Sequence, residues 1–405
     1  MSRSFLFTDS LNVASQPTTQ CTRTHHVAVV GAGAFGGWAA LHLLRRGVRV
    51  TLLDTWGPGN SRASSGGESR IIRATYGRDS VYVNMVARAL KLWEENQQRW
   101  ERKLYHKTGM LWMVGPDDEY EKASLPLFHQ AGLAFQSLNT NEAKKRYPQI
   151  NFEGVKWAIY EENAGYLTAR TACHAVLEGF LAEGGEYRQL SVRPGPIKGG
   201  EMHGLELSDG SLLTANQYIF ACGPWLGRLF PDELGKLIRP TRQEVFFLGI
   251  PAGENRFTEP HMPVWADNGP RLMYGVPDLN QGGFKVADDT RGPKFDPTSG
   301  ERLVTAQGIK RIRDYVGFRF PALKGAPVIE SRVCQYENSP DLHFLIDQHP
   351  HAGNVWLVGG GSGHGFKHGP ALGEIVAGLL VGKESPNPLF SFARFAKKSD
   401  PVLKD

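Results

Sequence analysis

The chain has 405 residues, of which 41% are hydrophobic and 21% charged, so it carries enough apolar material for a large core and for two domains. Its 46 basic and 41 acidic residues leave a formal net charge of only +5, and no basic run is interleaved with aromatic residues; nucleic acid is therefore not an expected partner. The four cysteines are widely separated and form neither a C-x-x-C pair nor a disulfide framework, which favours a reducing, cytoplasmic setting.

Neither end of the chain is predicted to be part of a folded domain. Residues 1–25 are rich in Ser, Thr and Gln and contain no apolar core of signal-peptide length, so we expect a disordered leader in which Cys21 is an incidental thiol. Residues 386–405 form a C-terminal tail, which we expect to be unstructured from Lys397 onward.

The glycine-rich stretch after the leader is the most informative. An apolar run at residues 27–30 predicts a buried parallel strand, and Gly31, Gly33 and Gly36 follow with the spacing G-x-G-x-x-G. These glycines suit a tight turn, the approach of a pyrophosphate, and close packing of helix on strand. A helix and a second strand follow, and Asp54 ends that strand where a carboxylate can accept hydrogen bonds from a ribose. This order predicts a dinucleotide-binding βαβ unit; a βαβ unit without a ligand is the alternative.

The same stretch is apolar enough over residues 27–44 to be considered as a membrane span. Its glycines, His42 within it and the acid beyond it favour the βαβ unit instead. We therefore expect no membrane association.

An arginine pair follows a loop rich in Gly, Pro and Ser. Arg70 and Arg73 flank a β-branched pair in the segment ESRIIR at residues 68–73. Their separation of three predicts that both guanidinium groups lie on one side of a helical turn. Taken alone, the segment leaves open whether the pair serves a site or anchors a loop through salt bridges.

The middle of the chain alternates between helical and strand-like patterns. Helical spacing predicts helices at residues 81–99, 141–146, 171–183 and 304–315. Strands are predicted at residues 108–114, within 155–167, at 217–222, and repeatedly between 238 and 287. The strand at 217–222 resembles the one that closes the nucleotide sheet of two-domain flavoproteins, and Cys222 in it is expected to be a core thiol. Alternation in the later strands predicts a mixed sheet with one exposed face.

A second informative segment lies at residues 334–380. It contains Cys334-Gln335-Tyr336, then SPDLHFLIDQHP, the strand NVWLVGG, and the loop GSGHGFK. Pro370 opens a helix whose apolar residues recur at helical spacing through Leu380. The positive end of this helix would face the loop, where a flavin that gains negative charge on reduction fits well.

These motifs together resemble the family of monomeric sarcosine oxidase and N-methyltryptophan oxidase, flavoenzymes of the D-amino-acid-oxidase-like superfamily. The resemblance is carried by SSGGESRIIRATYG, C-x-Y, SPDLHFLIDQHP and SGHGFK, in that order along the chain. It implies an α/β fold with a Rossmann-like FAD-binding domain and a second α+β substrate domain built around a mixed sheet. The implied FAD-binding domain is discontinuous, over residues 26–80, 155–230 and 331–385, and the substrate domain takes residues 81–154 and 231–330.

The resemblance also implies roles for individual residues. Cys334 would bond through sulfur to the 8α position of FAD, with a small buried hydrophobe as the alternative. Arg73 and Lys367 would hold a substrate carboxylate, and Lys285 would speed the reaction with dioxygen by stabilising superoxide. Tyr274 and Tyr336 would contact the substrate. The residues expected around the cofactor are Gly31, Gly33, Gly36, Asp54, Ser64, Ser69, Arg70, Cys334, Gly361, Gly363, His364, Gly365 and Lys367.

One position departs from the sarcosine oxidase pattern. Four residues beyond Lys285, where that enzyme has a pocket histidine, this chain has Asp289, preceded by Asp288. The acidic pair looks more like fructosyl amino acid oxidases and would favour a cationic amine or a hydroxyl-rich group. Alternatively, the two acids cap the following turn.

The expected activity is that of an FAD-dependent amine oxidase. The substrate would be an amino acid, in particular a secondary N-alkyl amino acid, oxidised at its C–N bond to an imine that hydrolyses, with dioxygen reduced to hydrogen peroxide. Two related readings stay open, a fructosyl amino acid oxidase and an FAD amine dehydrogenase with another acceptor; a flavin-binding protein without turnover is the non-enzymatic alternative. We expect no metal and a monomeric chain.

Overall fold

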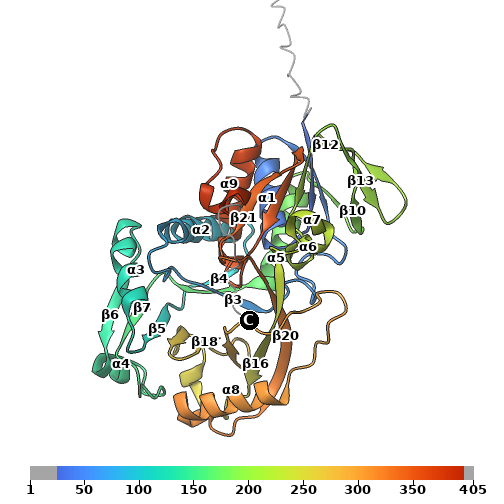
Figure 1. The fold of residues 1–405 in the computed structure, drawn as a ribbon. Coiled ribbons are helices and arrows are strands. Elements are labelled where there is room, and N and C mark those ends of the chain that lie inside the picture. Colours follow the sequence, from blue (N-terminus) through green and yellow to red (C-terminus); the bar gives the residue numbers. More distant parts are fainter. Residues whose placement is uncertain (1–24, 396–405) are drawn as a thin grey trace, which may run out of the picture.

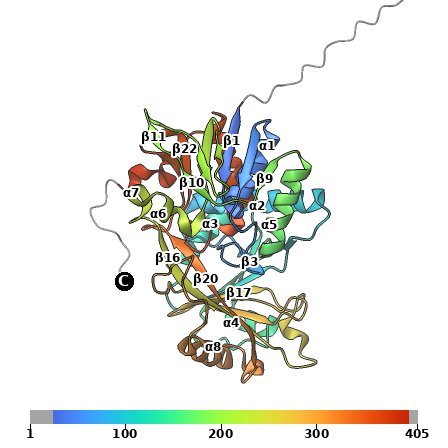
Figure 2. The same ribbon diagram turned by 90° about the vertical axis from the view of Figure 1, so that its right-hand side faces the viewer.

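The computed structural model describes residues 25–395 and divides them between two large sheets (Figures 1 and 2). The first sheet has six strands in the order β21-β22-β15-β1-β2-β9. The second has eight strands in the order β20-β16-β19-β18-β17-β5-β7-β6. The predicted leader up to residue 24, with Cys21, and the tail from residue 396 lie outside the described residues.

The six-stranded sheet contains the predicted nucleotide-binding unit, and we call this side of the molecule the nucleotide half. Its strands are β1 (His26–Val30), β2 (Arg49–Leu53), β9 (Glu186–Arg188), β15 (Gln217–Phe220), β21 (Leu345–His349) and β22 (Ala352–Gly359). All neighbouring pairs are parallel except β21–β22. This sheet confirms the Rossmann-like prediction. The strand β15, which we expected to close the sheet, instead lies inside it, because β22 pairs with its free side.

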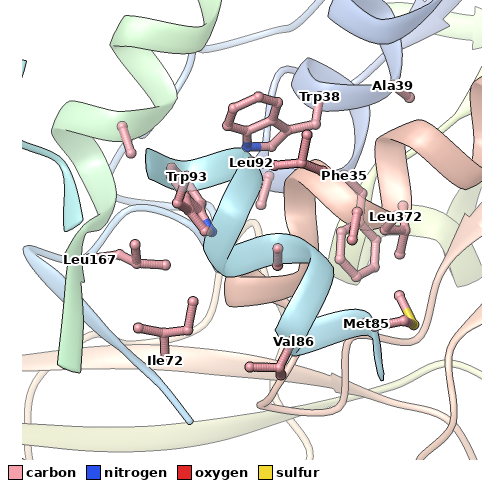
Figure 3. Close-up of a cluster of buried hydrophobic side chains, with 14 of the residues drawn as sticks. Phe35, Trp38, Ala39, Ile72, Met85, Val86, Leu92, Trp93, Leu167 and Leu372 are labelled. Atoms are coloured by element: carbon pink, nitrogen blue, oxygen red, sulfur yellow. The ribbon is translucent and has the colours of Figure 1, made fainter. Parts of the chain in front are cut away.

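Four helices contribute to the apolar core on one face of this sheet. They are α1 (Ala34–Arg45), α2 (Ser80–Arg99), α5 (Ala169–Ala182) and α9 (Gly369–Leu380). Figure 3 shows α2 beside α1 and α9, with Trp93 of α2 close to Trp38 of α1. The two indole rings meet edge to face with centroids 5.2 Å apart, a favoured aromatic geometry. The apolar spacing at residues 81–99 therefore reflects packing onto the nucleotide half.

The eight-stranded sheet forms the second layer. Its strands are β5 (Met110–Val114), β6 (Phe135–Asn139), β7 (Trp157–Glu161), β16 (Arg239–Leu248), β17 (Val264–Asn268), β18 (Leu272–Val276), β19 (Phe284–Asp288) and β20 (Val328–Asn338). It is mixed, as predicted, because β17 pairs with β5 in parallel while its other ladders are antiparallel.

Neither face of the central strands of this sheet is open to solvent. Phe284 and Val286 face a core that is closed by α8 (Ala306–Arg319), seen under the sheet in Figures 1 and 2. Lys285 and Ala287 alternate with them and point to the opposite face. Lys285 is only 4% exposed, so the expectation of one exposed face is wrong here. The reason is that the nucleotide half covers that face.

A small three-stranded sheet connects the two halves. It contains β3 (Ser69–Ile72), β4 (Tyr105–His106) and β8 (Gly165–Thr168), with Arg70 opposite Leu167. The prediction of a helical turn around Arg70 and Arg73 is therefore wrong. Backbone pairing with β8, which is distant in sequence, fixes the segment as a strand that ends just before Arg73.

The remaining elements are short or peripheral. They are α3 (Glu119–Gln130), α4 (Thr140–Arg146), α6 (Leu226–Leu229), α7 (Pro231–Leu234), β10 (Val192–Pro194), β11 (Ile197–Lys198), β12 (Glu201–Met202), β13 (Leu205–Leu207) and β14 (Leu212–Leu213). Asn139 caps α4 in a reciprocal capping box with Glu142. None of the helices within residues 25–395 is long and apolar enough to cross a bilayer.

The predicted domain division stays a prediction. Three elements belong, wholly or in part, to the other half from the one that it assigns to them. The helix α2 packs on the nucleotide half, whereas β7 and β20 are strands of the eight-stranded sheet. Residues 386–395, which belong to the predicted tail, include the buried Phe390 and the ion pair of Arg394 with Asp341. Cys334 thus lies on a strand that belongs to the second layer.

Candidate cofactor and substrate site

A cavity of about 360 Å³ lies between the two layers. Its lining comes from the glycine turn after β1, from the loop at residues 360–366, and from β18 and β20. Eleven predicted site residues line it: Gly31, Gly33, Asp54, Ser64, Arg70, Tyr274, Cys334, Tyr336, Gly361, Gly363 and Gly365. The other predicted residues, Gly36, Ser69, Arg73, Lys285, Asp289, His364 and Lys367, are not part of this lining. They lie behind it or beside it, as described below.

The turn after β1 is shaped to admit a phosphate. Gly31 has φ +106°, and a side chain at Gly36 would stand 1.9 Å from the Gly31 carbonyl oxygen, so both positions require glycine. Gly33 precedes α1, whose first turn contains no acidic residue. The free N–H groups and the positive dipole end of α1 therefore face the cavity as an anion site.

Asp54 ends β2 beside this turn. One carboxylate oxygen accepts from the Ala32 N–H at 2.8 Å, and the other accepts from the Trp56 and Gly57 N–H groups, both at 2.8 Å. Burial raises the pKa of Asp54, and these three N–H donors oppose that rise. The carboxylate thus braces the turn while lining the cavity, and its remaining lone pairs fit ribose hydroxyls.

A first group of polar side chains surrounds Cys334 at the other end of the cavity. The Arg70 guanidinium lies 3.5 Å from the Cys334 sulfur and donates to the Ser64 carbonyl at 2.6 Å and the Ser69 carbonyl at 2.8 Å. Lys285 Nζ donates to the Ser69 carbonyl at 2.9 Å and to the Ser69 hydroxyl at 3.2 Å. Burial, followed by the charge of Arg70, lowers the pKa of Lys285 to about 7.

A second group surrounds the ring of Tyr76. The Arg73 guanidinium carbon lies 4.9 Å from the ring centroid and the Lys367 Nζ lies 5.1 Å from it. Arg73 also lies 4.8 Å from the Trp112 ring and donates to the Thr75 carbonyl. Burial and the neighbouring Arg73 lower the pKa of Lys367 well below its usual range. The two cations thus face the same small volume.

A chain of hydroxyls joins the two groups. The Tyr274 and Tyr336 hydroxyls lie 3.4 Å apart, and Tyr336 donates to the Asp289 carboxylate at 2.7 Å. Burial raises the pKa of Asp289, against the effects of this bond and of Arg73 and Lys367. The adjacent Asp288 faces away, where it caps Thr290 and pairs with Arg271 at 2.7 Å. The capping interpretation is therefore confirmed for Asp288, whereas a substrate role for Asp289 stays a prediction.

Several residues at the site were not singled out by the sequence. Glu161 on β7 accepts from the Ala74 N–H at 2.6 Å, the Thr75 N–H at 3.2 Å and the Thr75 hydroxyl at 2.6 Å, and so holds the loop that follows Arg73. Glu337 lines the cavity directly after the C-x-Y motif. Tyr76 lies in the quoted arginine segment, and its hydroxyl contacts His364 at 3.1 Å and His368 at 2.8 Å. No local pattern marks Glu161, because its partners are 86 and 87 residues away.

Cys222 at the end of β15 is only partly a core thiol. It is half-buried, its sulfur contacts the Val30 carbonyl at 3.4 Å, and it lines the cavity. Burial raises its pKa, so we expect a neutral thiol.

Comparison with known proteins identifies the family. The family model described as "FAD dependent oxidoreductase" matches residues 26–379. The chain is 32% identical to monomeric sarcosine oxidase of Streptomyces avermitilis, over 91% of this chain and 97% of that protein. It is 28% identical to N-methyl-L-tryptophan oxidase of Yersinia pestis, over 92% of this chain and 99% of that protein.

A solved structure agrees with this assignment at the level of the fold. The L-proline dehydrogenase of P. horikoshii superposes with a TM-score of 0.80, at 20% identity, over 92% of this chain and 98% of that chain. The sequence motifs, the glycine turn with its anion site, and the cavity between the two layers fit FAD as the cofactor. The chain belongs to the family of FAD-dependent oxidoreductases that includes the monomeric sarcosine oxidases.

Proposed function

We propose that the protein is an FAD-dependent amine oxidase that acts on a secondary amino acid at its CH–NH bond. The supporting observation is the state of four cations, the half-buried Arg70 and Arg73 and the buried Lys285 and Lys367. Within residues 25–395 all four direct their polar contacts to neutral groups and none forms a salt bridge. Buried charge without a counter-ion is costly, so the site is prepared for an anionic ligand.

The carboxylate of the substrate would bind between Arg73 and Lys367. Each cation is already held by a neutral carbonyl, Arg73 by Thr75 and Lys367 by His364 at 2.8 Å, so its charge remains available. Both lie against the Tyr76 ring, which excludes water from one side. Charge-assisted hydrogen bonds in such a dry setting are about twice as strong as neutral ones.

The amine of the substrate would lie near Tyr274, Tyr336 and Asp289. When bound, FAD supplies the two-electron acceptor that takes a hydride equivalent from the carbon next to nitrogen. Only a neutral amine can give up this hydride equivalent, so the Asp289 carboxylate would accept the proton of the ammonium form while the two hydroxyls orient the nitrogen. The resulting imine is hydrolysed by water to an amine and a carbonyl compound.

Dioxygen is the proposed acceptor of the two electrons, with hydrogen peroxide as the product. Lys285 supports this part of the proposal because its ammonium group lies in the same buried region as Arg70 and Cys334 and can stabilise superoxide. We also propose that Cys334 attaches FAD covalently; its exposure to the cavity and its 3.5 Å contact with Arg70 support this. The monomeric state and the cytoplasmic setting belong to the same proposal, and the free thiols of Cys173, Cys222 and Cys334 agree with the latter.

An anaerobic bleaching screen tests the proposal. The purified yellow protein is mixed without dioxygen with N-methyl, cyclic and glycated amino acids and with their amides, and the absorbance of the flavin is followed. We expect bleaching by at least one secondary amino acid and much slower bleaching by its amide. Bleaching by glycated amino acids alone would instead favour the fructosyl amino acid oxidase reading. Admission of air then separates an oxidase, which recovers its colour, from a dehydrogenase. Failure of every amine would overturn the proposal.

A further inference from the structure

Glu337 is a buried acid that lines the cavity and has no role in the proposed reaction. Glu337 is 7% exposed and lies on β20, three residues after Cys334. One of its oxygens accepts from the Gly361 N–H at 3.1 Å. The other, Oε2, is buried and has no hydrogen-bond partner within the described residues. A buried polar atom without a partner costs about 1–3 kcal/mol and calls for an explanation.

Three glycines leave room around this carboxyl group. A side chain at Gly361 would come within 3.0 Å of Oε1, and side chains at Gly223 and Gly359 would come within 3.6 Å and 3.5 Å of Oε2. Burial raises the pKa of Glu337 to about 7, and no cation contributes to that shift. Two other acids of the region, the buried Glu161 and the half-buried Asp54, have three hydrogen-bond donors each. Glu337 alone among these three keeps an oxygen without a hydrogen-bond partner, and its side chain is part of the cavity lining.

The position of Glu337 along the cavity indicates which part of FAD it meets. At one end, the glycine turn at Gly31 packs on Ala221, two residues before Gly223, and provides the phosphate site. At the other end lies Cys334, beside Arg70. Glu337 lies between them, next to Gly223 and three strand residues from Cys334. In FAD the group that joins the diphosphate to the isoalloxazine ring is the ribityl chain, which carries hydroxyls.

We propose that Glu337 is a cofactor-binding residue whose free oxygen forms a hydrogen bond with a hydroxyl of the ribityl chain of FAD. A hydroxyl suits this oxygen because it can donate to a carboxylate and accept from a carboxylic acid, so the contact survives either protonation state. A phosphate would suit it less, because no cation offsets the repulsion between two anions. The inference concerns how the cofactor is held and does not depend on which amine is oxidised.

The test uses the full chain with Cys334→Ser, produced in cells starved of riboflavin so that flavins bind reversibly. Glu337→Leu and Glu337→Gln are compared in this background, with Glu244→Gln as the control. Glu244 lies on the adjacent strand β16, where it pairs with Arg242 and does not line the cavity. Binding of FAD, of riboflavin, and of lumiflavin, which lacks the ribityl chain, is measured by quenching of flavin fluorescence.

We expect Glu337→Leu to weaken the binding of FAD and of riboflavin by about tenfold or more and to leave the binding of lumiflavin unchanged. Glu337→Gln, which keeps a hydrogen-bonding oxygen, should stay within about threefold for all three flavins, as should the control. A second measurement guards against misfolding: without flavin, Glu337→Leu should melt at the same temperature as the parent or higher, because it removes a buried acid without a full set of partners. Equal affinity of the Leu variant for riboflavin, or an equal loss for lumiflavin, would overturn the assignment. Neither outcome would bear on amine oxidation, which the bleaching screen tests separately.

Discussion

The loop that carries Arg73 depends on one buried carboxylate, and replacing Glu161 by Gln tests that dependence. Glu161 accepts two hydrogen bonds at Oε1, from the N–H and hydroxyl of Thr75, and one at Oε2, from the Ala74 N–H. In the variant the amide oxygen can keep the two bonds from Thr75. The amide nitrogen then faces the Ala74 N–H, so two donors meet and that bond is lost.

The size of the effect follows from these contacts. A hydrogen bond to a charged acceptor contributes about 1.5–3 kcal/mol, and leaving the Ala74 N–H without a partner adds to the loss. Burial raises the pKa of Glu161, so the neutral amide recovers part of the cost of burying a charge. We expect a net local loss of about 2 kcal/mol, which corresponds to an equilibrium constant for opening of the loop that is about 30-fold larger.

Hydrogen exchange measures this opening directly. In native conditions, peptides that cover residues 72–76 should exchange about 30-fold faster in Glu161→Gln, and binding of a substrate carboxylate should weaken because Arg73 is held less firmly. Glu162→Gln is the matched control, because within the described residues the Glu162 side chain bonds only the Gln136 side chain, at the surface. It should leave exchange of this segment unchanged. Unchanged exchange in Glu161→Gln would refute the reasoning that Glu161 holds this loop.

Four further predictions concern the cofactor and the pocket. Lys285→Met should slow reoxidation in air by about two to three orders of magnitude, since a unit charge about 4 Å away contributes up to about 4 kcal/mol at an effective dielectric of 20. In the unmodified protein the stopped-flow reoxidation rate should fall as pH rises through about 7, because the charged form of Lys285 is lost, and the variant should lack this dependence. Lys367→Met should weaken the binding of propanoate by about tenfold to a hundredfold and leave the binding of propanamide unchanged. Binding is measured by the change that each ligand causes in the flavin spectrum. Cys334→Ser should release all yellow colour into the supernatant on denaturation, where the unmodified chain retains it. Gly36→Ala should prevent FAD binding, measured as flavin per chain, because the added carbon would stand 1.9 Å from the Gly31 carbonyl oxygen.

Local patterns predicted most of the nucleotide half. The glycine spacing, the helix at residues 81–99 and the helix after Pro370 all reflect contacts between neighbours in sequence, and the structure places them within a few residues of the predicted bounds. The strand Ser69–Ile72 was missed, because the separation of three that suits a helix was outweighed by pairing with β8. The helix α8 runs four residues beyond the predicted end, to Arg319, because the buried pair of Arg319 with Asp267 extends it.

Some residues of the candidate site could likewise be predicted from the sequence, and others could not. Motifs identified the cations and the tyrosines, since these residue types lie in segments with a recognisable order. Sequence could not distinguish Asp288 from Asp289, because the end of a strand sends adjacent side chains to opposite faces and only the tertiary fold decides which face is the pocket. Glu161 could not be found at all, since its role exists only after β7 has met the loop after β3.

The apolar core also holds a charged residue of the pocket in place. A buried cation keeps its charge available for a ligand only if its own backbone cannot move to find a closer counter-ion. The Lys367 carbonyl accepts from the Trp93 indole N–H at 2.9 Å, and Trp93 on α2 packs against Trp38 of α1 with no exposed surface (Figure 3). The apolar face of α2 therefore fixes the position of Lys367 as well as stabilising the nucleotide half. Truncating Trp93 should accordingly weaken carboxylate binding as well as the fold, because the support of the lysine and the core of the domain are the same side chain.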